Sequence, residues 1–219
     1  QIQSRLDKEF RVIEMKKLAG YFLVVSDISD FCKREGILSQ GRGSAANSVV
    51  CYALGITAVD PIEHDLLFER FLSEKYERYP DIDIDLPSGD DRESVIQHVY
   101  NKYGRRSSAM TANVICYRGK SAVREVGKTF GFGKEVLGKL SNLNSQYETS
   151  KGEELDQRLK EEGFNTADNQ RLRKFADLYN RILDFPRHLG QHSGGMVVSW
   201  GRLDSIVPIE PASMPDRRI

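Results

Sequence analysis

Three aspartates alternate with apolar residues in one short stretch of the chain, where Asp81, Asp83 and Asp85 are separated by Ile82 and Ile84. Side chains of a β-strand alternate between two faces, so this spacing places the three carboxylates on one face. Residues two positions apart lie about 7 Å from one another along a strand. Two such carboxylates can bind a shared pair of Mg²⁺ ions held about 3.5–4 Å apart.

An acidic stretch of this kind can also belong to an edge strand or to a calcium-binding loop. A row of charges can protect an edge strand from aggregation without binding any ion. A calcium-binding EF-hand loop is disfavoured, because its glycine directly follows the third acidic position and Leu86 follows Asp85 here. The stretch alone leaves a metal site and a protected edge strand as alternatives.

A glycine-rich turn, Gly41-Arg42-Gly43-Ser44, precedes the acidic stretch. Glycine lets the backbone approach a ligand closely, and Ser44 can cap a helix expected over 45–54. The amides at that helix end and the Arg42 guanidinium suit a phosphate group. The turn is neither a Walker loop nor a dinucleotide fingerprint, and alone it is most often only structural. Together with the aspartates it meets both needs of nucleotidyl transfer, a phosphate cradle and metal ligands.

Hydrophobic periodicity and glycine positions predict the elements that carry these residues. We expect helices over 2–18, 26–34, 45–54, 64–72 and 90–103, and strands over 21–25, 81–86, 109–117, 196–199 and 205–209. Gly36 is expected to end the helix over 26–34, and Gly55 the helix over 45–54. Between 119 and 186 the pattern is helical and more polar, with an exposed loop over 141–154. The order of elements predicts an α/β domain interrupted by a helical insertion.

Composition and residue spacing bear on the class of protein to which the chain can belong. The 219 residues contain 32 basic and 32 acidic side chains, so overall charge gives no support for a nucleic-acid binder. No apolar run is long enough to cross a membrane, and the separate cysteines Cys32, Cys51 and Cys116 indicate a reduced, cytoplasmic protein. His188 and His192 lack the spacing of a zinc site. Because the first residue is Gln1, we expect a piece of a longer protein.

Several motifs of the chain are specific enough to compare with a known family. They are Gly-Arg-Gly-Ser-Ala-Ala-Asn-Ser within 41–57, Asp-Pro at 60–61, Phe-Glu-Arg-Phe at 68–71, Pro-Asp-Ile-Asp-Ile-Asp at 80–85, Tyr-Arg-Gly-Lys-Ser at the start of 117–127, Gln-His-Ser-Gly-Gly at 191–195 and Pro-Ile-Glu-Pro-Ala-Ser at the start of 208–217. They resemble the palm of the bacterial C-family DNA polymerases, which include the polymerase III alpha subunit, and most closely the error-prone branch. The likeness covers nearly the whole chain, and 141–170 matches only in character.

The resemblance implies an α/β fold, a nucleotidyltransferase palm similar to that of polymerase beta with an inserted all-helical thumb. The palm is then expected over 1–116 and 188–219, with the thumb over 117–187. The implied activity is DNA-directed DNA synthesis, which adds a deoxynucleotide to a primer 3′-hydroxyl with two Mg²⁺ ions, in error-prone or translesion synthesis. The implied partners are primer–template DNA and deoxynucleoside triphosphates, with a sliding clamp and mutagenesis accessory proteins bound through regions outside this chain. No membrane partner is expected.

The resemblance also assigns roles to individual residues. Asp83 and Asp85 match the two metal-binding, catalytic aspartates, and Gly43 and Ser44 match the phosphate turn, assisted by Arg42. The family's third metal-binding aspartate is expected beyond residue 219, because Asp204 and Asp216 have the wrong sequence context. We therefore expect this chain to be inactive, or nearly so, by itself.

Further basic residues are candidates for phosphate contacts. Arg70 and Arg78 lie before the acidic stretch and either reach a triphosphate or offset the carboxylates. Lys120, Arg124 and Lys128 recur every four residues and follow Arg118, so they form one helix face that suits duplex DNA. A solvated helix face is the alternative. His192 is either a phosphate contact or a buried, hydrogen-bonded histidine.

Two rival functions remain open at the level of sequence. The first is a different nucleotidyltransferase, one that modifies a small molecule or an RNA end and supplies its third carboxylate from within this chain. The second is a binding module for nucleotides or nucleic acid in which a metal ion serves only as a structural staple.

Overall fold

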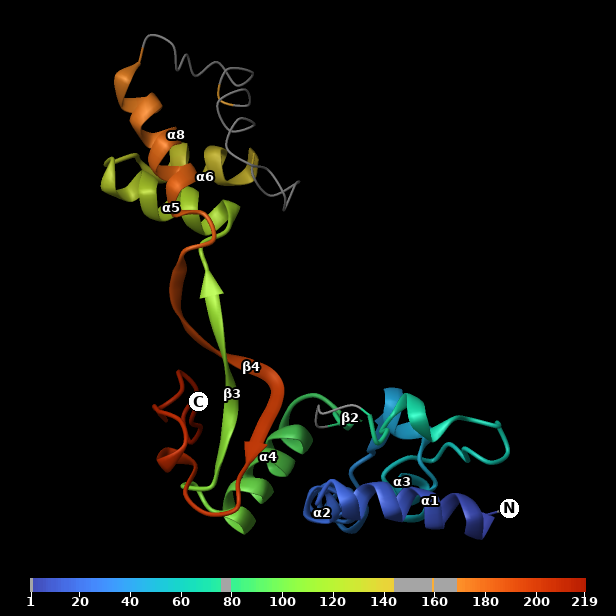
Figure 1. Cartoon of the computed structure of the whole chain (residues 1–219). Helices are drawn as coiled ribbons and strands as arrows, with labels where there is room; N and C mark the ends of the chain where they lie inside the picture. Colours follow the sequence, from blue (N-terminus) through green and yellow to red (C-terminus); the bar gives the residue numbers. More distant parts are fainter. Residues whose placement is uncertain (1, 76–79, 144–158, 160–168) are drawn as a thin grey trace. The chain divides into compact units, whose positions relative to one another are not determined.

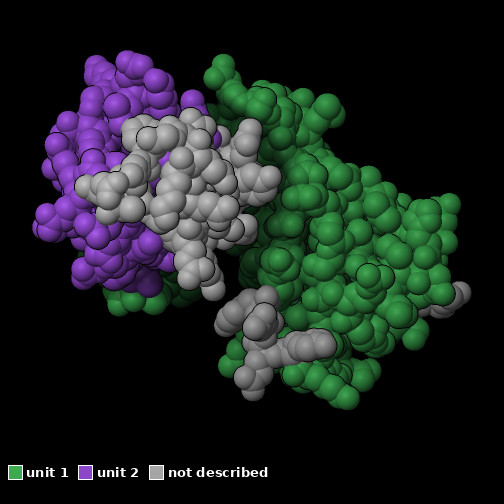
Figure 2. All heavy atoms as spheres, turned by 90° about the horizontal axis from the view of Figure 1, so that it is seen from above, with its two compact units in different colours: residues 1–108, 198–206 green, residues 109–197, 207–219 purple. Residues whose placement is uncertain are grey.

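The computed structural model describes residues 2–75, 80–143, 159 and 169–219. Contacts divide the chain into two compact units, coloured separately in Figure 2. Unit 1 comprises residues 1–108 and 198–206, and unit 2 comprises residues 109–197 and 207–219. The palm and thumb boundaries expected at 116/117 and 187/188 remain a prediction.

Unit 1 is a mixture of helices with one small sheet (Figure 1). Its elements are α1 (Ile2–Met15), α2 (Ala19–Glu35), β1 (Gln40–Arg42), the 3-10 helix η1 (Gly43–Asn47), α3 (Val49–Ala53), the 3-10 helix η2 (Phe68–Arg70), β2 (Asp83–Asp85), α4 (Asp90–Tyr103) and the 3-10 helix η3 (Leu203–Ser205). Strands β1 and β2 pair in antiparallel fashion and form the two-stranded sheet.

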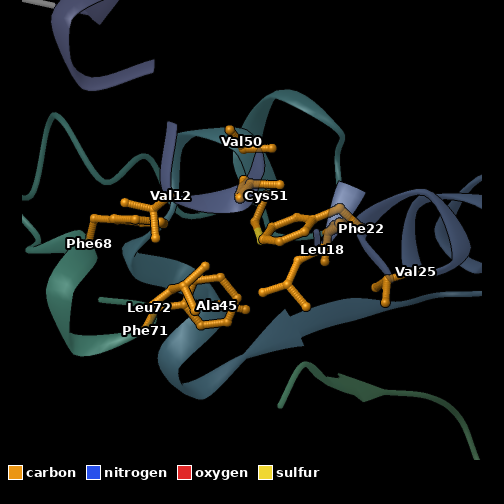
Figure 3. Packing of buried hydrophobic residues seen from close by; sticks show 12 residues of the cluster. Val12, Leu18, Phe22, Val25, Ala45, Val50, Cys51, Phe68, Phe71 and Leu72 are labelled. Atoms are coloured by element: carbon orange, nitrogen blue, oxygen red, sulfur yellow. The ribbon is translucent and has the colours of Figure 1, made fainter. Parts of the chain in front are cut away.

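The core of unit 1 is aromatic and aliphatic (Figure 3). Phe22 of α2 meets Phe71 edge to face, with 5.9 Å between the ring centroids. The half-buried Ile82 and Ile84 pack against this core, whereas the three aspartates that alternate with them are exposed. The alternation read from the sequence is therefore confirmed: the apolar face of this segment is anchored in the core and the acidic face points outward.

The expected strand at 21–25 is wrong, because these residues lie inside α2. Buried positions of α2 recur at helical spacing and share one face; they are Phe22, Val25, Ser26, Ser29 and Cys32. A short apolar run fits a strand or a buried helix equally well, and here the longer periodic pattern decides. Helix α2 ends as expected at Gly36, whose φ of 70° is left-handed.

Two other expected helices are shorter than predicted. Only η2 forms within 64–72, and the helix expected over 45–54 is divided into η1 and α3. Gly55 follows α3 with a φ of 65°, as its predicted C-terminal position requires.

Helices α2 and α4 are joined by a polar cluster centred on Asp27. Its carboxylate accepts hydrogen bonds from His98 Nε2 at 3.1 Å, from the Tyr103 hydroxyl at 3.0 Å and from Lys102. Burial raises the pKa of Asp27, but these three donors more than offset burial, so its pKa lies below the ordinary value. Burial and the bond to Asp27 raise the pKa of Tyr103 to about 12. The cluster therefore fixes α4 with a carboxylate that stays charged.

Unit 2 contains a two-stranded ribbon and a helical bundle. Its elements are β3 (Ser108–Cys116), α5 (Gly119–Thr129), α6 (Lys134–Leu143), α8 (Gln170–Ile182) and β4 (Pro186–Val198). Strand β3 pairs with β4, and the three helices close around a core that includes Val123, Leu140 and Phe175.

The helical texture predicted between 119 and 186 is confirmed for the described residues. Helix α6 extends to Leu143, so the start of the expected 141–154 loop is helical, and the rest of that loop lies outside the described residues. The strand expected at 196–199 is the end of the longer β4, and 205–209 contains no strand. Over the described ranges, no helix is long and apolar enough to cross a membrane.

Candidate active site and nucleic-acid interface

Pairing of β1 with β2 brings the glycine-rich turn beside the aspartates. In this register Gln40 lies opposite Asp85 and Arg42 lies opposite Asp83. Directly opposed residues of an antiparallel pair share a face, so Arg42 is on the same face as both carboxylates. At the intervening position, Gly41 donates its amide to the Ile56 carbonyl at 2.7 Å.

The two glycines of the turn, Gly41 and Gly43, are required for different reasons. An ideal Cβ built on Gly41 would lie 2.4 Å from the Ile56 carbonyl oxygen, so any side chain there would collide with backbone. Gly43 has a φ of 68°, a left-handed conformation that favours glycine. An ideal Cβ on Gly43 would lie 3.9 Å from Asp83 Oδ2, which places the start of η1 next to the first candidate ligand.

Ser44 follows Gly43 and also faces β2. Its hydroxyl lies 3.5 Å from the Asp81 carbonyl oxygen, at the outer limit of a hydrogen bond. The Ile82 amide donates to the Tyr21 hydroxyl at 3.0 Å, which fixes the entry to β2. Burial, with the charges of Asp81 and Asp83, raises the pKa of Tyr21 despite that bond, so the phenol stays neutral.

The two candidate metal ligands have different surroundings. Asp85 Oδ1 is 2.9 Å from Arg42 Nε, in an ion pair whose side chains are 63% and 62% exposed. The Asp83 carboxylate is exposed and forms no ion pair with a described residue. Asp83 is thus accessible to a metal ion, whereas Asp85 already has Arg42 as a counterion.

Asp83 and Asp85 fit a Mg²⁺ site in part. Carboxylate oxygens are the hard ligands that Mg²⁺ prefers, and both side chains are accessible. The part of the chain that the structure describes contains no group of three His, Cys, Asp or Glu side chains placed to hold a metal ion. Asp204 forms a two-pronged ion pair with Arg202, which lowers the pKa of that carboxyl. A further ligand would have to come from elsewhere.

The expected anion site at a helix N-terminus is wrong. Helix α3 begins at Val49 rather than at residue 45, and its cap is Ser48, whose hydroxyl oxygen accepts from the Cys51 amide at 3.1 Å. The carboxylate of Glu9 in α1 accepts the Ser48 hydroxyl at 2.7 Å and the Val49 and Val50 amides at 2.8 and 3.0 Å. This helix end is therefore already occupied by the carboxylate of Glu9.

Sequence reasoning missed Glu9, although a signal exists. Glu9 is only 1% exposed, and it lies between the apolar positions Leu6 and Ile13 that define the inner face of α1. An acidic residue in such a series is costly to bury unless it has partners. It therefore marks a carboxylate with a structural task.

The remaining candidate near the turn is Arg70. It lies in η2, which packs against η1, and its side chain is exposed. Arg78 lies outside the described residues.

The basic stripe predicted for 120–128 lies on α5 in unit 2. Lys120, Arg124 and Lys128 are exposed, and the opposite face of the helix is buried. Lys128 pairs with Glu125 at 3.1 Å, and Arg118 pairs with Asp184. No described carboxylate pairs with Lys120 or Arg124, which leaves these two cations available to an external anion.

His192 lies in β4, where it is half-buried and bonded to two glycines of the same strand. Its Nδ1 accepts the Gly194 and Gly195 amides at 3.1 and 2.5 Å. In a neutral ring with this arrangement Nε2 carries the proton, so it is the nitrogen that can donate to an anion.

Comparison with known proteins gives consistent matches. Residues 1–219 match the model of the family described as the bacterial DNA polymerase III alpha NTPase domain. The chain is 48% identical to an error-prone DNA polymerase of Xanthomonas axonopodis pv. citri (strain 306), and the alignment covers 100% of this chain and 20% of that protein. It is 45% identical to one of Anaeromyxobacter sp. (strain K), with 100% and 19% covered. The chain thus spans about a fifth of the length of these relatives.

These matches confirm the resemblance to polymerase III alpha and its error-prone branch that the motifs indicate. The mixed α/β character of the chain agrees with it. The chain therefore belongs to the family of the bacterial DNA polymerase III alpha NTPase domain.

Proposed function

We propose that the full-length protein carrying this chain is a DNA-directed DNA polymerase that works in error-prone or translesion synthesis. It adds a deoxynucleotide to the 3′-hydroxyl of a primer on a DNA template. The observation that carries the proposal is the β1–β2 pairing, which sets the Gly43–Ser44 turn beside Asp83. Family membership and the names of the relatives support the same reaction.

Asp83 and Asp85 would hold two Mg²⁺ ions together with a carboxylate from outside this chain. When bound, such ions lower the pKa of an attacking hydroxyl and stabilise a leaving pyrophosphate. Gly43 and Ser44 would hold the triphosphate through backbone and hydroxyl donors, with Arg42 and Arg70 as its cationic contacts. The role of these residues is to bind and orient the reacting groups, which is the main protein contribution to this class of reaction.

The palm and the thumb are assigned to segments of the chain as the resemblance to the family implies. Segments 1–116 and 188–219 would form the palm, and α5, α6 and α8 would form the thumb within 117–187. Support comes from the position of the helical bundle, which is inserted in sequence between the paired strands β3 and β4. Primer–template DNA would contact the thumb through Arg118, Lys120, Arg124 and Lys128, and His192 would offer Nε2 to a phosphate.

The two rival functions find less support. Both need a third metal ligand within the chain, one for catalysis and the other for a stable staple. The described ranges place no third carboxylate, histidine or cysteine with Asp83 and Asp85.

Primer extension is the direct test of the proposed reaction. The full-length protein should extend a primed template in the presence of Mg²⁺, while residues 1–219 alone should not, because their described part places no third carboxylate with Asp83 and Asp85. Robust extension by the isolated chain would contradict the requirement for that external ligand.

The α5 stripe can be tested separately through the salt dependence of DNA binding. Replacing Lys120 and Arg124 with Gln should weaken DNA binding by the full-length protein and reduce the slope of log K against log salt by about 1–2, since each phosphate contact contributes about 0.9. Fluorescence anisotropy with a labelled primer–template at several salt concentrations measures this. Replacing Lys134 and Lys139 of α6 removes the same charge, and an equal loss in that control would argue against a specific stripe.

A further inference from the structure

The ion pair between Arg42 and Asp85 is the one contact in the candidate site, among the described residues, that conflicts with metal binding. Arg42 lies opposite Asp83 in the strand register, yet its Nε is 2.9 Å from Asp85 Oδ1, its diagonal neighbour. A guanidinium held on a carboxylate competes with a divalent ion for the same oxygen atoms. Asp83, with no ion pair of its own in the part of the chain that is described, presents no such obstacle.

The exposure of the pair indicates how firmly it is held. Both side chains are more than 60% exposed, so water and salt screen their attraction. An exposed pair of this kind shifts an equilibrium by a factor of about two to five. The pair is thus strong enough to form in the free site. It is also weak enough for a divalent ion to replace Arg42 on Asp85, or for a phosphate to replace Asp85 on Arg42.

The position of Arg42 gives it a second anionic partner. It directly precedes Gly43 and Ser44, the residues proposed to hold the triphosphate, and Gly43 has no side chain that could separate the guanidinium from a bound phosphate. Arg42 approaches Asp85 through Nε, and neither terminal nitrogen of the guanidinium donates a hydrogen bond to a described residue. Arginine binds phosphate oxygens through paired donors, which is a better match than this approach through Nε.

We propose that Arg42 is an exchangeable counterion of Asp85. It neutralises Asp85 while the site is free of nucleotide, and it transfers to the triphosphate when the nucleotide binds, which releases Asp85 to a divalent ion. The inference rests on the proposed polymerase function and adds an order of binding to it. Asp83 can bind a divalent ion in the free site, whereas Asp85 can do so only after the nucleotide has bound. Metal and triphosphate then strengthen one another's binding through Arg42, and this coupling is reciprocal.

Metal binding without nucleotide tests the first half of the exchange. Mn²⁺ is titrated into the full-length protein, and the signal is the binding lost when Asp83 and Asp85 are both replaced by Asn. Arg42→Gln should tighten this binding about two- to fivefold, because the competitor is removed. Arg11→Gln, which removes an exposed cation of α1, should leave it unchanged.

Triphosphate binding without metal tests the second half. Inorganic tripolyphosphate is titrated into the full-length protein in the presence of a chelator. Asp85→Asn should tighten its binding about two- to fivefold more than Asp83→Asn, because only Asp85 holds Arg42. Both variants remove one charge from the same face of β2, and Asp83 lies nearer to the Gly43–Ser44 turn. Ordinary repulsion alone therefore predicts the larger gain for Asp83→Asn, which is the opposite of the result expected from the exchange. Arg42→Gln should abolish the larger gain of Asp85→Asn.

Each outcome separates the exchange from the proposed function. Equal Mn²⁺ affinity in the wild type and in Arg42→Gln, or equal effects of Asp83→Asn and Asp85→Asn on tripolyphosphate, would overturn the exchange and leave the polymerase proposal intact. Absence of any Mn²⁺ binding that depends on Asp83 and Asp85, in a full-length protein that extends primers, would overturn both the exchange and the assigned metal ligands.

Discussion

Replacing Asp83 or Asp85 with Asn in the full-length protein is expected to reduce primer extension by at least about 10³-fold, the scale of losing a preorganised charge at a reacting centre. Asparagine keeps the shape of the side chain and removes the negative charge that a divalent ion requires. Both side chains are exposed on one face of β2, so the substitutions should leave the core contacts of Ile82 and Ile84 intact. The loss should therefore appear in the chemical step, with folding unchanged.

Single-turnover extension of a labelled primer at saturating nucleotide measures this effect. DNA affinity and melting temperature are recorded on the same preparations, and both should stay close to the wild type. Asp81→Asn is the matched control, because Asp81 is equally exposed but contributes only its backbone carbonyl to the contact with Ser44. Extension by Asp83→Asn within tenfold of the wild type would remove Asp83 from the catalytic residues.

The parts of the candidate site that the sequence predicts correctly depend on local rules. Strict alternation over residues 81–85 predicts which face of a strand is polar, and the packing of the half-buried Ile82 and Ile84 against the core confirms it. The left-handed glycine at position 36 follows from the end of a periodic helix in the same way. Such features need only the residues that are adjacent in sequence.

The parts that the sequence does not predict depend on distant contacts. The pairing of β1 with β2 joins residues some forty positions apart, and the Arg42–Asp85 ion pair exists only because of that register. The run at 21–25 has strand composition but is helical, because its buried positions continue the stripe of α2 as far as Cys32. Tertiary packing overrides local propensity in such cases.

The start of α3 shows how a single distant side chain can change the interpretation of a motif. A Gly-Ser turn before a helical pattern predicts a helix whose free amides attract phosphate. Here Glu9, forty positions earlier than Val49, bonds two of those amides and the Ser48 hydroxyl. The helix consequently begins five residues after Ser44, and the turn is left as a separate 3-10 segment facing β2.

Replacing Glu9 with Ala is therefore expected to destabilise the 219-residue chain by about 3–5 kcal/mol, because each buried donor left without an acceptor costs about 1–3 kcal/mol. Three donors would lose their acceptor in a site that is 1% exposed, and α3 would lose the anion at its N-terminus. Glu9→Gln should cost about 1–3 kcal/mol, because its amide oxygen can keep some of these bonds while its NH₂ group meets another donor.

Urea denaturation followed by far-UV circular dichroism gives the free energy of unfolding for both Glu9 variants. Glu14→Gln is the matched control, because Glu14 is exposed on the same helix, and its effect should stay within about 0.5 kcal/mol. The loss of stability should be largest for Glu9→Ala, smaller for Glu9→Gln and smallest for Glu14→Gln. This order follows from the number of donors that each variant leaves without an acceptor. A Glu9→Ala variant as stable as the control would show that water replaces the carboxylate and that Glu9 does not fix the start of α3. The separation of the Gly43–Ser44 turn from α3 would then need another cause.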